Sequence, residues 1–375
     1  MVFSIITTLL LLGNALAQSY TGPQDARLVD ELVLDIDTNG VSTTPSGRLF
    51  MVISHVDGST GTPSVVEFNR TTNTTTAYPD AEWNSYASGK DPATHFVSIN
   101  SQRIGPDGNL YVVDTGAPGF GVPAILPGGP KLVQVNITTS TVTRVYSMDN
   151  ATRSDSFLDD VRFHTATGMA YLTDAGSPGF IVLNLATGET RRVLDNDLST
   201  RQYMPVSAEG TILQNKGKPD YIYNDQLEVS PCGKYLYFQP ASGGMSVIET
   251  KYLEEAYYNS SMNSNTIMDQ YVQPYAHTPS TGGTAIDAKG VVYVSDTDSQ
   301  RIISIAPNGT MTTLVQDPRL LWVDAMWVDT SGKLWMPAAQ LNRGTAFNNG
   351  TSYIVKPLHV FTLDIGTGPS PIDHA

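Results

Sequence analysis

The feature that most constrains the fold of this 375-residue chain is a tight turn that recurs six times, each time followed by an apolar strand. One copy reads Pro106-Asp-Gly108-Asn-Leu-Tyr111, with a glycine in the turn and an aromatic residue three positions later. Glycine supplies the positive φ that such hairpin turns require. The turn glycines are Gly47, Gly108, Gly168, Gly233, Gly290 and Gly332, at intervals of 42 to 65 residues.

Repeats of this size predict the architecture. An interval of roughly 60 residues suits a four-stranded sheet with long loops, and a repeat made of strands buries its faces by packing sheet against sheet around an axis. The sequence therefore predicts an all-β fold, a six-bladed β-propeller formed by residues 18–375 as one domain. We expect an N-terminal strand, Leu28 to Ile36, to close the ring by pairing with strands between Tyr353 and Ile365. The one helix expected is Lys251 to Tyr258.

The N-terminus and the sequons indicate export. Residues 1–17 combine an apolar run with Ala15-Leu16-Ala17, the small-x-small pattern of a signal-peptide cleavage site. A single cysteine, Cys232, cannot form an internal disulfide and is expected to be a small buried residue beside a turn. Asn-x-Ser/Thr sequons predict N-glycosylation of exposed loops in a secreted or secretory-pathway protein. They lie at Asn69, Asn73, Asn136, Asn150, Asn259, Asn308 and Asn349.

The charge balance excludes two classes of partner. With 22 Lys and Arg against 36 Asp and Glu, the net charge is −14. Nucleic acids and anionic membranes both need clustered cations, so neither is expected as the main partner. The sequence also lacks a Walker loop, a G-x-S-x-G elbow and a paired-cysteine zinc motif. Aromatic residues near the expected mouth of the channel, named below, instead predict a small apolar or aromatic metabolite as the partner.

The propeller prediction converts spacing into position. Eight residues before each turn glycine, the chain should lie near the top of an innermost strand, where strand propensity disfavours Asn and Asp. Those positions hold Asn39, Asn100, Asp160, Asp225, Gly282 and Asp324.

Two interpretations of this ring remain open. The five Asn and Asp side chains are either a hard-cation site for Ca²⁺ or Mg²⁺ or a proton-transfer cluster of carboxyl groups. Alternatively, they begin strands by bonding to loop amides around a water-filled channel.

Other polar and aromatic residues are expected near the same face. Asp114-Thr115-Gly116, Asp174-Ala175-Gly176 and Asp296-Thr297-Asp298 predict Asx-turns. The segments Gly116 to Lys131 and Gln340 to Gly350 are long enough to act as lids. His277 is the best acid or base candidate. Ligand-binding candidates are Trp83, Tyr223 and Trp322, together with Asn100, Asp160, Asp225 and Asp324 of the ring.

Residues 95–116, HFVSINSQRIGPDGNLYVVDTG, resemble the signature of the Yellow/major royal jelly protein family, in which an Arg-bearing strand leads through a Gly turn to a W-V-L-D-T-G strand. Further similar stretches follow in order: PKLVQVN from Pro130, FLDDV from Phe157, AYLTDA from Ala170 and WVDAMWVD from Trp322, then QLNR from Gln340. The similarity covers roughly residues 80–365 but lacks the cysteines usual in the family, so its disulfides cannot be carried over.

The resemblance implies a six-bladed propeller and leaves three functions open. Fungal secreted propellers of similar appearance catalyse a hetero-Diels–Alder reaction, which implies a cofactor-independent cyclase of secondary metabolism with Arg103 or His277 polarising a carbonyl. Distant six-bladed lactonases place Asn and Asp metal ligands at a similar position, which implies a metal-dependent hydrolase with Ca or Mg in the channel. Other family members bind small molecules without catalysis.

Overall fold

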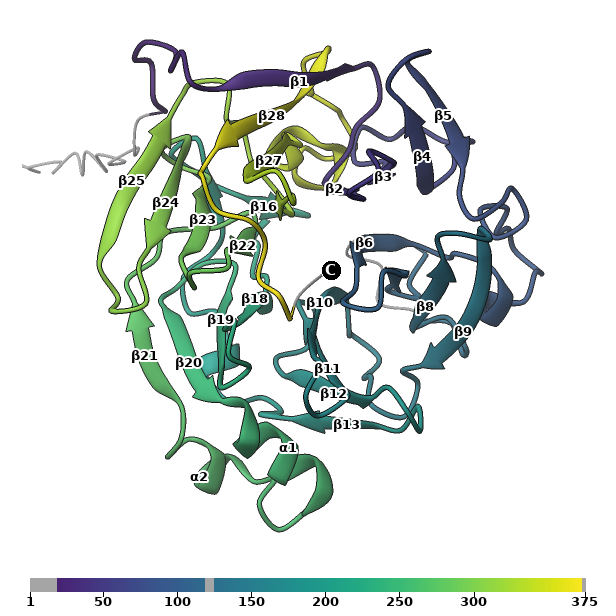
Figure 1. Cartoon of the computed structure of the whole chain (residues 1–375), viewed down its shortest axis with the longest axis vertical. Helices are drawn as coiled ribbons and strands as arrows, with labels where there is room; N and C mark the ends of the chain where they lie inside the picture. Colours follow the sequence, from purple (N-terminus) through teal and green to yellow (C-terminus); the bar gives the residue numbers. More distant parts are fainter. Residues whose placement is uncertain (1–18, 119–124, 373–375) are drawn as a thin grey trace, which may run out of the picture.

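The computed structural model describes residues 19–118 and 125–372. Within them, six four-stranded antiparallel sheets surround a central axis (Figure 1). In each sheet the innermost strand leads into a turn glycine, and the second strand climbs back beside it. The predicted six-bladed β-propeller is confirmed. The signal-peptide residues 1–17 lie outside the described residues.

The blades are numbered in chain order, and their strands are given from the axis outward. Blade 1 has β2 (Gly40–Thr43), β3 (Leu49–Val52), β4 (Val65–Asn69) and β5 (Thr74–Ala77). Blade 2 has β6 (Ile99–Ile104), β7 (Leu110–Asp114), β8 (Lys131–Asn136) and β9 (Thr141–Ser147). Blade 3 has β10 (Leu158–His164), β11 (Met169–Asp174), β12 (Phe180–Asn184) and β13 (Thr190–Val193).

The second half of the ring has the same order. Blade 4 has β18 (Asn224–Val229), β19 (Tyr235–Pro240), β20 (Met245–Glu249) and β21 (Gln273–Ala276). Blade 5 has β22 (Thr284–Ile286), β23 (Val292–Asp296), β24 (Arg301–Ile305) and β25 (Met311–Gln316). Blade 6 has β26 (Trp327–Val328), β27 (Lys333–Ala338), β28 (Leu358–Asp364) and β1 (Val29–Leu34).

The sequence dictates this arrangement at two levels. All six repeat glycines have positive φ, between 69° and 87°, as the turns require. The second strands are buried on both faces, and β3 and β11 have no exposed residue. Aromatic rings join neighbouring blades, since Tyr111 of β7 lies 4.6 Å from Phe163 of β10, and Phe180 of β12 lies 4.9 Å from Phe238 of β19, measured between ring centroids. Blade-to-blade packing therefore forms the core.

The ring closes as predicted. β1 pairs antiparallel with β28, so the N-terminal strand becomes the outermost strand of the last blade. The predicted helix is α1 (Thr250–Tyr258), which with α2 (Asn265–Met268) is inserted between β20 and β21. Among the described residues, no helix has the length and apolar character needed to cross a membrane.

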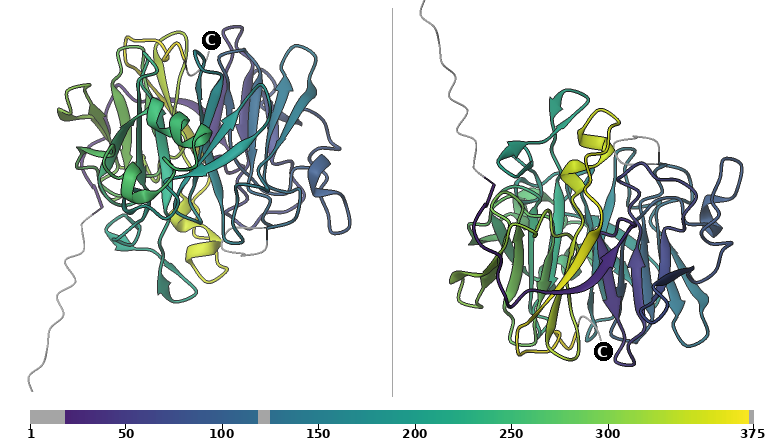
Figure 2. Two further views of the ribbon diagram at one scale, coloured as in Figure 1. Left: turned by 90° about the horizontal axis from the view of Figure 1, so that it is seen from below. Right: turned by 90° about the horizontal axis from the view of Figure 1, so that it is seen from above.

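The two faces of the ring differ. We call the face where the innermost strands begin the top and the face with the glycine turns the bottom. On the top, the hairpins β14–β15 (Ser207–Ala208, Thr211–Ile212) and β16–β17 (Gln214–Asn215, Lys218–Pro219) project beside η3 (Leu341–Arg343) and η4 (Thr345–Phe347) (Figure 2). The expected lid Gln340 to Gly350 thus lies on the top. Part of the other expected lid, residues 119–124, lies outside the described residues.

The bottom is crossed by the chain after β28, which runs toward the centre of the ring (Figure 1). Its Gly368 carbonyl accepts a hydrogen bond from Ala288 at the turn of blade 5. Short 3-10 helices occur at η1 (Pro92–Thr94) and η2 (Leu198–Thr200). The expectation that Cys232 is buried was wrong, because the turn directs its side chain to the surface.

The predicted Asx-turns are confirmed in three blades. The Oδ1 atom of Asp114 accepts from the Gly116 amide at 3.0 Å, and the same bond joins Asp174 to Gly176 at 3.2 Å. Asp296 Oδ1 accepts from the Asp298 amide at 3.1 Å. These aspartates shape the loops that follow the second strands.

Candidate functional site

The ring of Asn and Asp residues lies where the innermost strands begin, and β-bulges place several of its members. Asn100 is the extra residue between Ile99 and Ser101 in β6, and Asp225 is the extra residue between Asn224 and Gln226 in β18. A bulge leaves one residue without a partner in the ladder and turns its side chain away from the regular pleat. The bulges therefore explain how residues disfavoured in strands are accommodated here.

In blade 3 the bulge spans Asp159 and Asp160, and the two aspartates have different hydrogen-bond partners. Asp159 accepts a hydrogen bond from Asn100 Nδ2 and joins the ring. Asp160, the residue reached by counting, accepts instead from Arg162 Nη1 at 2.5 Å. Counting eight residues back from the turn glycine missed Asp159, because the count assumes that every strand residue has one partner in the neighbouring strand, and a bulge breaks this rule.

Hydrogen bonds near the ring link every blade to the next and close the circle. Because each bond joins two blades, these polar contacts beside the ring help to hold the propeller together. The contacts are Asn39 Nδ2 to Asn100 O (2.9 Å), Ser101 Oγ to Asp159 O (2.6 Å), Thr173 Oγ1 to Asp225 O (2.8 Å), Gln226 Nε2 to Thr281 O (3.1 Å), Ser295 Oγ to Val323 O (2.7 Å) and Ala325 N to Asn39 O (3.0 Å).

Blade 5 is the exception to the Asn/Asp pattern for a steric reason. A Cβ atom on Gly282 would lie 2.4 Å from the Val323 carbonyl oxygen and 3.1 Å from the Trp322 ring. Real Cβ atoms do not approach backbone oxygen so closely, so only glycine fits at this point of the ring.

The three ring carboxyl groups have raised pKa values. Burial raises the pKa of Asp159 to about 7, the charge of Asp160 adds to the effect, and hydrogen bonds with Asp225 and Asn100 oppose it. Burial, and then repulsion from Asp159, raise the pKa of Asp225 well above its usual value. The pKa of Asp324 is raised by the same two causes. The cluster therefore holds protons at pH values where ordinary aspartates have lost them.

The ring offers oxygen donors of the kind that Ca²⁺ and Mg²⁺ prefer, and the buried Asn39 Oδ1 has no hydrogen-bond partner in the described part of the chain. However, no three His, Cys, Asp or Glu side chains of the described chain come close enough together to hold a metal ion. A cation at the ring would therefore need ligands besides its carboxyl groups, such as the amide oxygen of Asn39.

A buried ion pair joins the innermost strands of blades 3 and 4. Arg162 donates from Nε and Nη2 to the two carboxylate oxygens of Glu228, at 2.9 and 2.7 Å. Their side chains are 1% and 0% exposed. Thr284 Oγ1 of blade 5 donates to the same carboxylate at 2.9 Å. Charges at the axis are therefore satisfied by other blades.

A hydrophobic cap covers part of the top. Val206, Leu213 and Ile222, which flank and join the two hairpins, pack with Trp322, and Phe347 of η4 packs against this cluster. The Trp322 indole N–H donates to Asp324 Oδ2 at 3.0 Å, which connects the cap to the ring.

An ion pair fastens the two segments of the cap. Arg343 Nη2 lies 2.7 Å from Glu209 Oε1, and Asn342 Nδ2 also donates to Glu209. A cleft of about 520 Å³ lies between these segments and includes Phe347 and Tyr353 in its wall.

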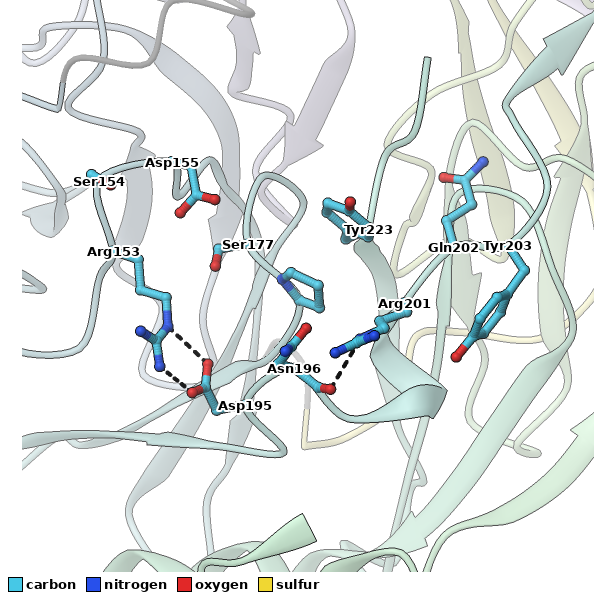
Figure 3. Close-up of a pocket in the computed structure, with 11 residues that line it drawn as sticks. Arg153, Ser154, Asp155, Ser177, Asp195, Asn196, Arg201, Gln202, Tyr203 and Tyr223 are labelled. Carbon is cyan, nitrogen blue, oxygen red and sulfur yellow. Dashed lines mark hydrogen bonds and ion pairs between the residues drawn. The ribbon is translucent and has the colours of Figure 1, made fainter. Parts of the chain in front are cut away.

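A second cleft, here the polar cleft, opens on the top of blade 3 and has a volume of about 650 Å³. Its lining includes Arg153, Asp155, Asp195, Asn196, Arg201, Gln202, Tyr203 and Tyr223 (Figure 3). Arg153 Nε donates to Asp195 Oδ1 at 2.9 Å, and Arg192 Nε donates to the same oxygen at 2.6 Å. Burial opposes the charge of Asp195, but these two arginines outweigh it and lower its pKa. Of the predicted ligand-binding residues, Tyr223 lines this cleft.

A third cleft, here the apolar cleft, lies on the top edge of blade 4 and has a volume of about 490 Å³. Its lining includes Leu198, Tyr203, Met204, Met245, Tyr275 and His277. Leu198, Tyr203 and Met204 are 62%, 62% and 64% exposed, which is unusual for side chains of this size. The His277 ring is exposed, and no residue of the described chain holds it by a hydrogen bond or ion pair.

The remaining predicted residues lie elsewhere. Arg103 is 3% exposed, and its guanidinium carbon lies 5.4 Å from the centre of the Trp327 ring. The Trp83 ring lies 5.2 Å from the Phe96 ring between centroids, tilted by 46°, and packs against the core. Neither residue lines one of the three clefts, and the structure does not bring Arg103 and His277 into one cleft. The linker Leu198–Met204 carries no repeat pattern, so sequence reasoning missed it.

A family model described as major royal jelly protein matches residues 97–354 of the chain. No curated protein matches the sequence.

Several solved structures are similar in fold. A gluconolactonase from Xanthomonas campestris shares 11% identity over 90% of this chain and 89% of that chain, with a TM-score of 0.53. A luciferin-regenerating enzyme shares 13% identity over 92% and 96%, with a TM-score of 0.52. The calcium-binding protein regucalcin from Agrobacterium tumefaciens shares 10% identity over 91% and 93%, with a TM-score of 0.52. At these identities the similarity shows the fold alone.

Proposed function

The chain belongs to the major royal jelly protein family, and from this premise we propose that it binds a small apolar or aromatic metabolite in the apolar cleft and promotes a cofactor-independent cyclisation of hetero-Diels–Alder type. The family does not assign a reaction. The proposal rests on one observation: a cleft with three highly exposed apolar side chains has beside it an imidazole with no partner in the described chain.

The chemistry asks little of the protein. In a cycloaddition all atoms of the two reactants remain in the product, so no electron or group donor is needed. The cleft contributes by holding both partners in near-attack geometry. A ring N–H of His277 donates a hydrogen bond to the reactant oxygen, on which negative charge grows in the transition state. Tyr275 and Met245 supply apolar surface for the other partner.

The test is an assay with an ortho-quinone methide, generated in place from its precursor, and a sesquiterpene alkene. Formation of the cycloadduct is followed by chiral chromatography with mass spectrometry. Removing a transition-state donor typically lowers kcat by about 100-fold, so we expect a loss of that order in His277→Ala. His277→Gln, which keeps a donor, should recover part of the rate.

Tyr258→Ala is the matched control, because Tyr258 is 70% exposed and lines none of the three clefts. An unchanged rate in His277→Ala, or equal losses in both variants, would contradict the proposal.

The two alternatives predict different results. A lactonase-like hydrolase, suggested by the gluconolactonase fold, should open a sugar lactone and lose activity and melting temperature on chelation of Ca²⁺ or Mg²⁺. It ranks lower because no three His, Cys, Asp or Glu side chains of the described chain form a group that could hold a metal ion. A non-catalytic binder should show saturable binding of the metabolite without any product.

We further propose that the protein is exported and N-glycosylated. Six of its seven sequon asparagines are exposed, the exception being Asn136, which is partly buried. Exposure is what an attached glycan requires. Treatment of the secreted protein with a glycosidase should lower its mass, and tryptic mapping should find Asn136 the least occupied.

A further inference from the structure

The polar and apolar clefts share a wall. Arg201 and Tyr203 line both of them, although the rest of each lining differs. Arg153 and Asp195 contribute charges to the polar cleft, whereas the apolar cleft has methionine, leucine and tyrosine side chains. A ligand that lies across Tyr203 therefore meets both environments.

Arg201 is the positively charged residue of this wall that forms no ion pair within the described chain. The neighbouring arginines, Arg153 and Arg192, each form an ion pair with Asp195. Arg201, in contrast, makes one side-chain hydrogen bond, from Nε to the Asn196 carbonyl at 3.1 Å, and no carboxylate of the described chain lies within ion-pair distance of it. Both Nη atoms of Arg201 are thus available to a ligand.

The surroundings of Arg201 favour an anion there. Figure 3 shows its guanidinium group between Asn196 and Tyr203, below Tyr223, with Asp155 on the opposite side of the polar cleft. The Nε contact with Asn196 holds the planar group in place. A fixed guanidinium group binds a carboxylate through two parallel hydrogen bonds.

We propose that Arg201 binds the acidic group of an amphipathic ligand, an apolar aromatic or alicyclic carboxylate, whose ring lies in the apolar cleft against Tyr203 and Met204. The inference rests on the proposed function and adds the substrate class. It also orients the ligand. With its carboxylate at Arg201, the aromatic or alicyclic ring of the ligand extends through the apolar cleft toward His277, which lines the same cleft.

The experiment compares two probes of one shape, naphthalene-2-carboxylate and the neutral naphthalene-2-methanol, by isothermal titration calorimetry. Wild type should bind the carboxylate at least tenfold more tightly. Arg201→Gln should remove this preference and change alcohol binding less than twofold, whereas Met204→Ala should weaken both probes. Arg201→Lys, which keeps the charge but loses the fork, should fall between wild type and Arg201→Gln.

Arg191→Gln is the control, because Arg191 is exposed on β13 and lines none of the three clefts. Thermal melting of each variant checks that it is folded. Tight binding of the alcohol with no preference for the carboxylate would overturn the role of Arg201. It would still support the apolar cleft as the ligand-binding site. Failure of wild type to bind either probe would overturn this inference and the proposed function together.

Discussion

The central axis and the clefts of the top face use the same polar residue types in opposite ways. At the axis, Arg162 and Glu228 are almost fully buried, and each charge meets its partner from a neighbouring blade. At the wall of the clefts, Arg201 is partly buried and has no carboxylate partner in the described chain. In this protein, a structural charged residue has an oppositely charged partner within the fold. A candidate ligand-binding one has none in the described chain.

The same difference predicts which variants reduce stability and which reduce ligand binding. Polar groups at the axis join blades, so their loss should be felt as unfolding. Side chains of the clefts face solvent, so their loss should be felt as weaker binding. Three variants test this division.

The largest effect is expected for Glu228→Gln, which keeps the shape of the side chain but leaves the buried Arg162 charge with Asp160 as its remaining acidic partner. Breaking a buried ion pair by removing one partner costs about 3–5 kcal/mol. Chemical denaturation should show a loss of this size. Lys251→Gln, at an exposed pair with Glu249, is the control and should leave the midpoint unchanged. Equal denaturation midpoints for wild type and Glu228→Gln would contradict the idea that charged residues at the axis stabilise the fold while those at the clefts do not.

A smaller, pH-dependent effect is expected for Asp159→Asn. Burial raises the pKa of Asp159 from 3.8 to about 7, so between these values the folded protein keeps a proton that the unfolded chain loses. The contribution of this group to the free energy of unfolding therefore falls as pH rises from about 4 to 7 and is constant above. Relative to Asp159→Asn, wild type should lose a few kcal/mol across this window.

Denaturation at pH 4.5 and pH 7.5 measures this difference. Asp269→Asn, at an exposed residue of the α2 region, should follow the wild-type profile. If Asp159→Asn also ran parallel to wild type, the ring would not hold a proton.

The smallest effect on stability is expected at the clefts. Met204→Ala removes a side chain that is 64% exposed, and such surface changes shift stability by less than about 0.5 kcal/mol. Binding of naphthalene-2-methanol should nevertheless weaken several-fold, because the ring loses apolar contact. A stability loss of several kcal/mol would mean that the linker Leu198–Met204 belongs to the core rather than to a binding site.

The architecture could be predicted because it repeats. Each turn glycine needs positive φ, and the strand that follows it is mostly apolar in all six blades, so one local rule observed six times defines the ring. The closing strand and α1 also have local signals, a segment rich in valine and leucine and a short run with several helix formers. Even the eight-residue count located the tops of the innermost strands.

The functional surface could be predicted less well because it does not repeat. Counting chose Asp160, while a bulge gave the ring position to Asp159. The apolar cleft depends on a linker between blades 3 and 4, whose position follows from packing and not from periodicity. Of the predicted aromatic residues, Tyr223 lines a cleft while Trp322 serves the cap, and only tertiary structure distinguishes the two.

The pairing of β1 with β28 has a consequence for how the chain is made. During synthesis the N-terminal strand leaves the ribosome first, but its hydrogen-bonding partner emerges only when nearly the whole polypeptide has been translated. Until then Val29–Leu34 has a free strand edge, open to wrong pairing with other nascent chains. The final blade can form only after translation of the last strand, so chaperones that shield exposed strand edges should associate with this protein early and depart late.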